Sequence, residues 1–509
     1  MKNYRYSVLA VSASLACASG TAMAAGFGVT VQSASGGGSS ATGHAMAEDA
    51  SAMWYNPALL SSVEGKQVNG GVAIIDAELK VTNTGSTTPD ISGRFIPIVG
   101  DNQGEPGGFS ATPSIYYKQD ISTNKAFGLG INIPFGVSTK YDADSFARYE
   151  ATESRLKTVN VNPAMSWQIN DKWALGAGLN VQYGHALLSK AVDSGLACRK
   201  VLAQGPDATQ RAELAAAQAA AAATAAGHSA EAVRSIAAAA GSLTALRFAN
   251  KACTDAGMGN LTDAANDSEM KVEALGFAFG ANVGAVYKPN AATTISVGYR
   301  STTKYKLEGD GDFTHKALAN LDNLAPGTLR AAGLVDQDAT ADLDLPASAS
   351  LAFARKLTDK LTLHGDVTWT QWSSVPEIRI VFPDTKLSDS VTSLEWEDTV
   401  RYGVGMTYKM NEKTTLRAGM AMDPTPTPGP QHRTPRAPRS DTAWFSVGMS
   451  HRINKKLSLD ASFSYLHPEK ATINYTAPGA KDGDPDGYFT RADVDSDAFA
   501  AALSVSYRF

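Results

Sequence analysis

The segment FAAALSVSYRF at the C-terminus, residues 499–509, alternates between two kinds of side chain. Phe, Ala, Leu, Val and Tyr occupy the odd positions, whereas Ala, Ser and Arg occupy the even positions. Because successive side chains of a β-strand point to opposite faces, this alternation predicts a strand with one apolar and one polar face. The segment also ends on an aromatic residue. These features are typical of the wall of a β-barrel whose outer surface meets lipid.

The same period of two recurs through much of the chain. In residues 400–410, apolar side chains fill the even positions, and Arg, Gly, Thr and Lys fill the odd ones. Residues 275–287 and 457–465 alternate in the same way. The pattern predicts fourteen strands, at 66–81, 109–118, 125–135, 157–169, 172–188, 270–288, 291–308, 341–355, 360–376, 396–410, 413–422, 441–452, 456–473 and 494–509.

The connections between these strands are alternately short and long. The short ones, such as 170–172 and 411–413, are polar and rich in Asn and Lys, which predicts tight hairpin turns. The long ones include 136–156 and 189–269. Short turns in the periplasm and long loops outside are typical of outer-membrane barrels. A soluble β-sandwich also alternates, but long strands with polar inner positions favour an all-β, 14-stranded antiparallel transmembrane barrel over residues 66–509.

The N-terminus has the features of an export signal. Lys2 and Arg5 precede a small, apolar stretch, and residues 22–24 have the small-x-small pattern of a cleavage site. We therefore expect residues 1–24 to be a signal peptide. A transmembrane anchor is the alternative, but it needs about 20 apolar residues and this stretch is shorter. No later stretch of about 18 apolar residues occurs, which excludes a helical membrane protein.

Residues 25–65 do not alternate. They are rich in Gly, Ala and Ser, and they contain the turn-forming Asn56-Pro57-Ala58. A barrel of fourteen strands has a lumen wide enough to leak solute unless something fills it. We therefore expect this segment, called the hatch below, to lie inside the lumen as a plug. A tail in the periplasm is the alternative.

Two cysteines follow the signal, Cys198 and Cys253, and both lie in the long loop 189–269. A pair of cysteines in an exported protein predicts a disulfide bond, with two free thiols as the alternative. No cluster of Cys or His surrounds them, so no metal site is expected. Between them, the alanine-rich tract 215–240 predicts helices, because alanine is the best helix former.

The composition and motifs also argue against several classes of function. The net charge of −5 favours no nucleic-acid partner. The eight histidines do not form an HExxH pattern, and no GxSxG motif occurs. We therefore expect neither an enzyme nor a bound cofactor.

Three motifs stand out in the sequence: GHAMAEDASAMWYNPA at residues 43–58, IPFG at 133–136 and WTQWS at 369–373. They resemble motifs of the FadL/TodX family of long-chain fatty acid transporters in Gram-negative outer membranes, and the similarity extends over the whole mature chain. The resemblance implies a fourteen-stranded barrel with a hatch and uptake of hydrophobic molecules. It also implies capture between the third and fourth outer loops, a lumenal pocket near the mature N-terminus, and lateral exit into the membrane at a kink in the third strand. The long third loop departs from the family.

A fatty acid needs an apolar slot for its tail and a cation for its carboxylate. On the seventh predicted strand, residues 295–299 place apolar side chains towards lipid, so Arg300 and Lys304 are expected in the lumen. Lys190, at the outer end of the fifth strand, is a third candidate for binding ligand. Phe27, near the start of the hatch, is expected to plug the pocket. The alternative for Arg300, Lys304 and Lys190 is that they only pair with lumenal carboxylates and do not touch ligand. Arg401 and Arg417 are also expected in the lumen.

A gate is predicted where the hatch meets the third strand. Asn56, Pro57 and Ala58 are expected to form a turn that packs against that strand. Pro134 cannot donate a ladder hydrogen bond, so it marks a break, and Gly136 follows it. An unpaired stretch there is a candidate lateral gate, and an ordinary strand end is the alternative.

Taken together, these features predict transport of long-chain fatty acids or similar hydrophobic compounds across the Gram-negative outer membrane, by gated passive diffusion with lateral exit. An importer of monoaromatic compounds or alkanes is the near alternative, and a general porin or a surface adhesin is the distant one. The expected surroundings are outer-membrane lipid and lipopolysaccharide, and the expected state is a monomer. Arg433, Arg436 and Arg439 are candidates for contact with lipopolysaccharide phosphates, with a solvated loop as the alternative.

Overall fold

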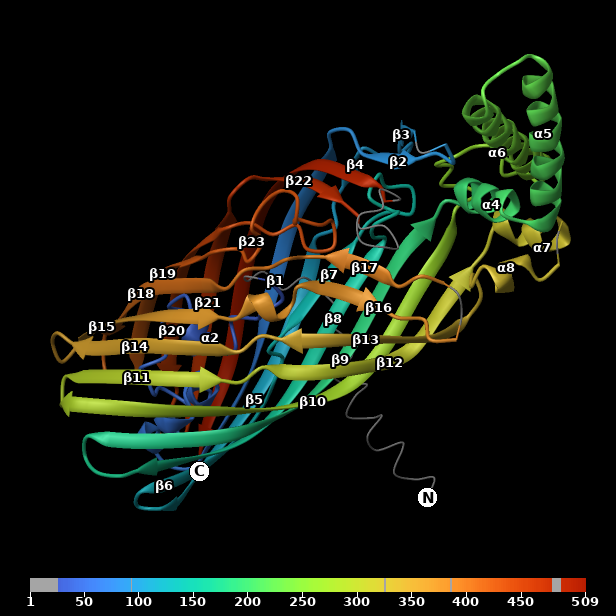
Figure 1. Cartoon of the computed structure of the whole chain (residues 1–509). Coiled ribbons are helices and arrows are strands. Elements are labelled where there is room, and N and C mark those ends of the chain that lie inside the picture. The colour runs from blue at the N-terminus through green and yellow to red at the C-terminus, as the bar shows by residue number, and fades with distance from the viewer. Residues whose placement is uncertain (1–25, 93, 325, 385–386, 478–486) are drawn as a thin grey trace.

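The computed structural model describes residues 26–509 apart from 93, 325, 385–386 and 478–486. The expected signal peptide lies outside the described residues. Fourteen antiparallel strands close into a barrel, in which the first strand, β1, pairs with the last, β23 (Figure 1). The predicted all-β, 14-stranded fold is therefore confirmed. Within the described part of the chain, no helix is both long and apolar enough to cross a membrane.

Eleven barrel strands are single elements, and three consist of two consecutive elements. In chain order the barrel contains β1 (Gln67–Asn83), β5 (Gly108–Ser122), β6 with β7 (Lys125–Asn132, Gly136–Lys140), β8 (Glu153–Gln168), β9 (Trp173–Val192), β10 (Ser268–Asn290), β11 with β12 (Thr293–Arg300, Thr303–Thr314), β13 with β14 (Gln337–Leu345, Ser348–Lys356), β15 (Leu361–Thr370), β18 (Thr399–Lys409), β19 (Thr414–Asp423), β20 (Thr442–Arg452), β21 (Leu457–Pro468) and β23 (Phe489–Arg508).

The remaining elements lie in the hatch and in the outer loops. The hatch contains α2 (Ala34–Gly37), α3 (Ala52–Tyr55) and the 3-10 helix η1 (Pro57–Ser62). The outer loops contain β2 (Thr87–Pro89), β3 (Phe95–Pro97), β4 (Gln103–Gly104), α4 (Ser194–Ala203), α5 (Pro206–Ala225), α6 (Ala230–Asp255), η2 (Ala317–Ala319), α7 (Asn320–Leu324), α8 (Thr328–Ala331), η3 (Trp372–Ser374), β16 (Glu377–Ile380), β17 (Ser390–Ser393) and β22 (Ala471–Thr476).

The barrel wall has the two faces that the sequence predicts. On β23, Phe499, Leu503 and Val505 are 41%, 65% and 44% exposed, whereas Ala500 and Ser504 are each 3% exposed. The exposed apolar side chains form the outer surface. The small and polar side chains of the other face point inward, where they leave room for the hatch.

The predicted hairpin turns share one hydrogen-bonding device. The side-chain oxygens of Asn170, Asn411 and Asn454 each accept hydrogen bonds from the backbone N–H groups two and three residues later, at 2.8–3.0 Å. An Asn side chain stabilises a tight turn in this way because it satisfies backbone donors that have no strand partner.

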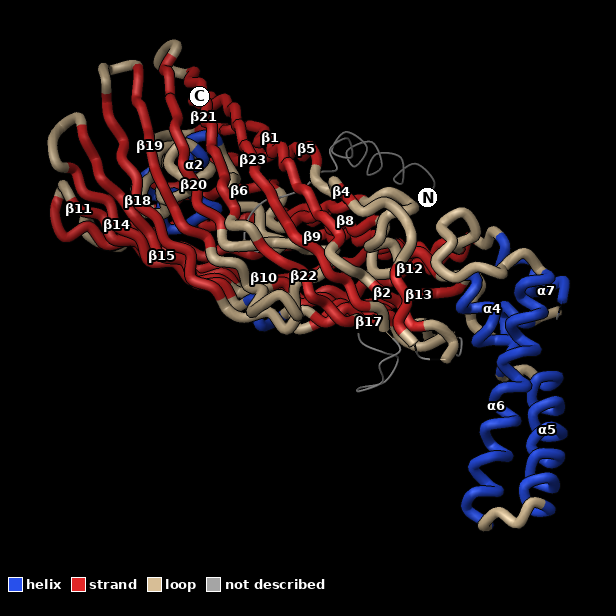
Figure 2. Tube along the Cα trace, turned by 90° about the horizontal axis from the view of Figure 1, so that it is seen from above, coloured by secondary structure: helices blue, strands red, loops and turns tan. Residues whose placement is uncertain are grey.

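The hatch lies inside the barrel, and Figure 2 shows α2 enclosed by the strands. It approaches the wall so closely that glycine is required at the contacts. A Cβ atom on Gly284 of β10 would collide with the Asn56 side chain, and one on Gly448 of β20 would lie 2.6 Å from the Cα of Gly38. Because β10 and β20 lie on different sides of the barrel, the hatch spans the lumen.

The seventh strand of the barrel contains a bulge that corrects one prediction. Residues 301–307 lie opposite residues 276–281, so the β11–β12 side carries one extra residue. Such a shift moves every later side chain to the other face. Arg300 precedes the bulge and contacts the hatch, whereas Lys304 follows it, is 76% exposed and pairs with Asp344 on the outside at 3.0 Å. The expectation that Lys304 faces the lumen is therefore wrong.

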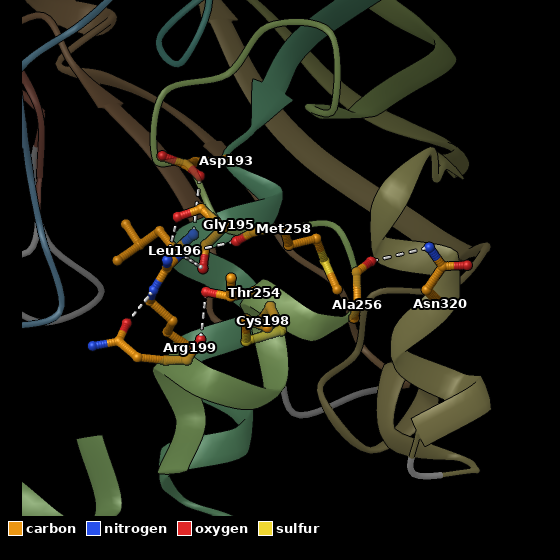
Figure 3. The surroundings of a disulfide bond; sticks show 12 residues. Asp193, Gly195, Leu196, Cys198, Arg199, Thr254, Ala256, Met258 and Asn320 are labelled. Atoms are coloured by element: carbon orange, nitrogen blue, oxygen red, sulfur yellow. Dashed lines mark hydrogen bonds between the residues drawn. A yellow bond between two sulfur atoms is a disulfide. The ribbon is translucent and has the colours of Figure 1, made fainter. Parts of the chain in front are cut away.

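The third outer loop forms a helical extension, as its alanine-rich sequence predicts. Helices α5 and α6 pack as an antiparallel hairpin that projects away from the barrel mouth (Figure 2). At its base a disulfide bond joins Cys198 of α4 to Cys253 of α6, with a Cα–Cα distance of 6.1 Å (Figure 3), so the predicted pairing is confirmed. Leu318 and Leu321 of the fourth outer loop pack beside the disulfide and are fully buried. The third and fourth outer loops are thus fastened together.

Loop 423–440 folds inward over the barrel mouth. Arg433 donates to the Thr472 carbonyl at 2.8 Å, and Arg436 donates to Ser154 at 2.9 Å. Both arginines are less than a tenth exposed. The expectations that these side chains meet lipopolysaccharide or solvent are wrong, because they hold the loop against the strands.

Candidate functional site

The third strand of the barrel is broken, and the hatch fills the break. Strand β6 ends at Asn132 and β7 begins at Gly136, and both pair with β8. Between them, the Pro134 carbonyl accepts a hydrogen bond from Val29 N–H at 2.9 Å, and Gly136 N–H donates to the Phe27 carbonyl at 2.8 Å. The proline cannot donate a hydrogen bond, so the chain bends away from regular pairing there. The hatch backbone replaces a neighbouring strand at this point.

This break interrupts the barrel ladder on one side. Residues 108–114 of β5 pair with β1, and residues 136–140 of β7 pair with β8, but among the described residues no strand pairing joins β5 to β7. The hatch bridges the interval instead. The side-chain amide of Gln32 donates to the Ile133 carbonyl at 2.8 Å. The backbone carbonyl of Gln32 accepts a hydrogen bond from the Tyr116 hydroxyl of β5 at 3.2 Å.

An apolar cluster lies beside the break. The ring of Phe27 packs 4.8 Å from Trp396 and 6.2 Å from Trp372, measured between ring centroids, and Phe27 is only 4% exposed. The other buried members are Val137, Leu156, Ala274, Ala278, Tyr305, Leu307, Leu343, Leu345, Val375, Leu394 and Ala437. A Cβ atom on Gly26 would lie 2.6 Å from the Trp372 ring. The start of the hatch is therefore packed tightly into an apolar region of the lumen.

A cavity of about 170 Å³ continues from this cluster between the hatch and the wall. Phe135 and Trp372 line its apolar part, and Arg300 and Arg401 line its polar part with His44 of the hatch. The site thus combines an apolar region with two cations, which is the combination that an amphiphilic anion requires.

Both arginines hold the hatch by a backbone carbonyl group. Arg300 donates to the Trp54 carbonyl at 2.8 Å, and its guanidinium group stacks 3.7 Å from the centroid of the Trp54 ring. Arg401 donates to the Ser40 carbonyl and lies 3.8 Å from Asp366. A further ion pair joins the wall to the hatch outside this cavity, between Arg417 and Glu48.

The structure brings some of the predicted site residues together and separates others. Phe27 and Arg300 lie on adjoining parts of the site. Lys190 does not line the cavity, because it lies at the outer end of β9 and donates to Ser390 at 3.0 Å. Lys304 faces outward. Pro134 and Gly136 lie at the break itself.

The turn at Asn56-Pro57-Ala58 is anchored on β11, and η1, which begins at Pro57, contacts β6 of the third strand as well as β8, β9 and β10. The predicted packing against the third strand is therefore one part of a wider set of contacts. The Asn56 side chain donates to Ser296 at 2.8 Å and to the Val297 carbonyl at 3.0 Å, so the turn is fixed on β11. Ala58 approaches Gly176 on β9. The wall carries glycines there, which allow the backbone of the turn to approach.

Sequence reasoning missed two parts of the site. Trp372 and Trp396 flank the loop after β15 and meet only because that loop folds into the mouth, 5.3 Å apart between centroids. Trp372 lies in the motif WTQWS, within the range 360–376 that the sequence predicts as the ninth strand, but β15 ends at Thr370 and Trp372 begins η3. His44, likewise inside a motif, lies 3.0 Å from Asp366. Trp372 and His44 lie in recognisable motifs, but no local sequence pattern predicts which distant residues they contact.

The fold and the site define an outer-membrane β-barrel whose lumen is filled by its own N-terminal segment. The chain belongs to the outer membrane protein transport protein family (OMPP1/FadL/TodX), whose model matches residues 15–509. It is therefore a protein of the Gram-negative outer membrane that belongs to a family of hydrophobic-compound transporters.

Relatives and solved structures agree with this assignment. The long-chain fatty acid transport protein of Escherichia coli is 23% identical over 478 residues, which cover 91% of each chain. A crystal structure of a Pseudomonas aeruginosa FadL homologue has a TM-score of 0.75 at 22% identity and covers 95% of this chain and 100% of that one. The Ralstonia pickettii toluene transporter TbuX has a TM-score of 0.58 at 17% identity, covering 94% and 98%. The structural likenesses establish the fold.

Proposed function

We propose that the protein imports long-chain fatty acids by passive, gated diffusion and releases them sideways into the outer membrane. The observation that carries this proposal is the replacement of strand pairing by the hatch at Phe27–Val29. The same short segment contacts the apolar cluster through Phe27 and closes the wall at Pro134 and Gly136. A ligand that displaces this segment from the cluster therefore also removes its hydrogen bonds to the break in the third strand.

The composition of the site supports a fatty acid. Each buried methylene group contributes about 0.8 kcal/mol, so the cluster provides the affinity for a tail. The two arginines provide donors for a carboxylate. The name of the Escherichia coli relative points to the same substrate class. A monoaromatic compound has no carboxylate, so an importer of such compounds would need the apolar cluster but not Arg300 and Arg401.

A cross-link at the break tests the proposed gate. Gly28 and Phe135 form an isolated antiparallel pair, and the hydrogen bonds lie on the residues flanking them. In such a pair the Cα atoms are about 4.5 Å apart, which suits a disulfide bond. Oxidation of the double variant Gly28→Cys with Phe135→Cys is expected to stop uptake of labelled oleate by cells, and reduction is expected to restore it.

Each single cysteine variant and the unaltered protein are the controls, treated with the same oxidant and reductant. Equal uptake by the oxidised and reduced double variant would contradict release through this break. Parallel uptake assays with labelled toluene test the substrate class, since preferred uptake of toluene would favour the near alternative.

A further inference from the structure

The polar side chains on one wall of the cavity are arranged in a regular way that suggests what unlocks the hatch. In the ladder from β11 to β18, Arg300 aligns with Ser348 and Thr370, and Arg401 aligns with Thr368 and, two strands away, Ser350. All of these residues line the cavity. The wall between the arginines therefore carries only small hydroxyl side chains.

The spacing of the strands places the arginines on opposite sides of this hydroxyl-lined wall. Strands β11 and β18 are three strand spacings apart, which is about 14 Å. Arg300 and Arg401 are also offset by two residues along the strands. Arg300 donates to Asn180 of β9, on the side away from Arg401, at 2.5 Å. An extended arginine side chain reaches about half of the separation between β11 and β18, so both guanidinium groups can approach one small anion between them once Arg300 turns from Asn180. The hydroxyl groups add donors along the same surface.

The guanidinium group of Arg401 has a hydrogen-bond donor that could bind an anion. Arg401 is 7% exposed, and its Nε atom has no hydrogen-bond partner within the described residues. Asp366, with which it forms an ion pair, is 3.8 Å away and is shared with His44. A buried guanidinium donor without a partner is costly, and a bound carboxylate would satisfy it.

We propose that the carboxylate of the ligand binds between Arg300 and Arg401 and thereby draws their guanidinium groups from the hatch carbonyls of Trp54 and Ser40. This inference rests on the proposed function and adds the step that couples binding to opening. A hydrogen bond from a guanidinium group to a carboxylate is stronger than one to a neutral carbonyl, so the exchange favours the ligand. The hatch then loses two of its contacts with the wall. An uncharged ligand leaves both contacts in place.

Hydrogen–deuterium exchange of the purified full-length protein tests this step. The ligands are oleate and methyl oleate, which share a tail and differ in charge. Oleate is expected to accelerate exchange in hatch peptides covering residues 39–56 severalfold, whereas methyl oleate at the same occupancy is expected to leave it unchanged. Occupancy is measured separately by binding of each ligand.

Three variants separate the arginine contacts from a general loosening of the hatch. Arg300→Gln and Arg401→Gln are each expected to weaken oleate binding about tenfold, leave methyl oleate binding unchanged and abolish the difference in exchange. Arg417→Gln removes a hatch contact outside the cavity. It is expected to raise exchange without ligand but to keep the difference between oleate and methyl oleate.

The outcomes distinguish this step from the proposed function. Equal acceleration by both ligands, or an unchanged difference in the Arg300→Gln and Arg401→Gln variants, would overturn the coupling while leaving fatty acid import in place. Failure of the protein to bind either ligand would instead overturn the proposed function.

Discussion

The backbone N–H of Gly136 donates a hydrogen bond to the carbonyl oxygen of Phe27, over a distance of 2.8 Å. These residues lie more than a hundred positions apart, one in the barrel wall and the other at the start of the hatch. The bond makes the plug part of the wall. The same residue, Phe27, places its side chain among Trp372 and Trp396. Movement of one short segment therefore changes both the apolar site and the continuity of the barrel.

Filling the break should stop transport without stopping binding. A Cβ atom on Gly136 would lie 3.9 Å from Val29 and 3.5 Å from the Leu156 carbonyl, so a larger side chain would extend into the interval beside the hatch. Gly136→Trp is expected to abolish uptake of labelled oleate by cells and to preserve binding by the purified protein. Uptake at the unaltered rate would show that the ligand leaves elsewhere.

Arg300 and Lys304 form a matched pair for testing the carboxylate contact, because only four positions separate them and they point to opposite faces. Arg300→Ala is expected to weaken oleate binding at least about tenfold, since a hydrogen bond to a charged group contributes about 1.5–3 kcal/mol. Lys304→Ala is expected to leave it unchanged. Titration of each purified variant with oleate measures both, and equal effects would mean that the cavity is not the binding site.

Phe27 competes with the ligand for the apolar cluster. Phe27→Ala removes a buried ring whose loss destabilises the closed hatch by about 3 kcal/mol. The variant is expected to bind oleate more tightly, because less apolar contact must be displaced, and to show greater proteolysis at the start of the hatch. Weaker binding would indicate that the ring contacts the bound tail and does not exclude it.

Removal of the hatch should convert the barrel into an open pore. The hatch contacts β10 and β20 on different sides of the lumen. The unaltered protein is expected to show little steady conductance in planar bilayers, and a variant lacking residues 26–62 is expected to conduct steadily. A large steady conductance of the unaltered protein would favour a general porin.

The disulfide bond is expected to stabilise the helical extension and not the barrel. Cys198 and Cys253 are 55 positions apart, and closing a loop of that length contributes about 4 kcal/mol in the chain-entropy model. The variant Cys198→Ser with Cys253→Ser should be cut faster by protease within α5 and α6. The β-sheet signal in circular dichroism is expected to stay unchanged, and its loss would show that the extension supports the barrel.

The sequence by itself determined the barrel, because the two-residue period of a strand shows directly which side chains meet lipid. The exposed Phe499 and Leu503 and the buried Ser504 are examples. It also determined the helical third loop and the pairing of Cys198 with Cys253. The break at Pro134 was predicted because proline lacks the donor that a ladder needs.

Only the tertiary structure decided which residues form the site. The single extra residue in β11–β12 reverses the face of Lys304, and a bulge of this kind has no marker in the local pattern. Trp396 reaches Phe27, and Arg401 reaches Ser40, through contacts between segments that are hundreds of residues apart. Alternation is a property of neighbours along the chain, whereas these contacts depend on where the closed barrel and the inward-folding loops place distant segments.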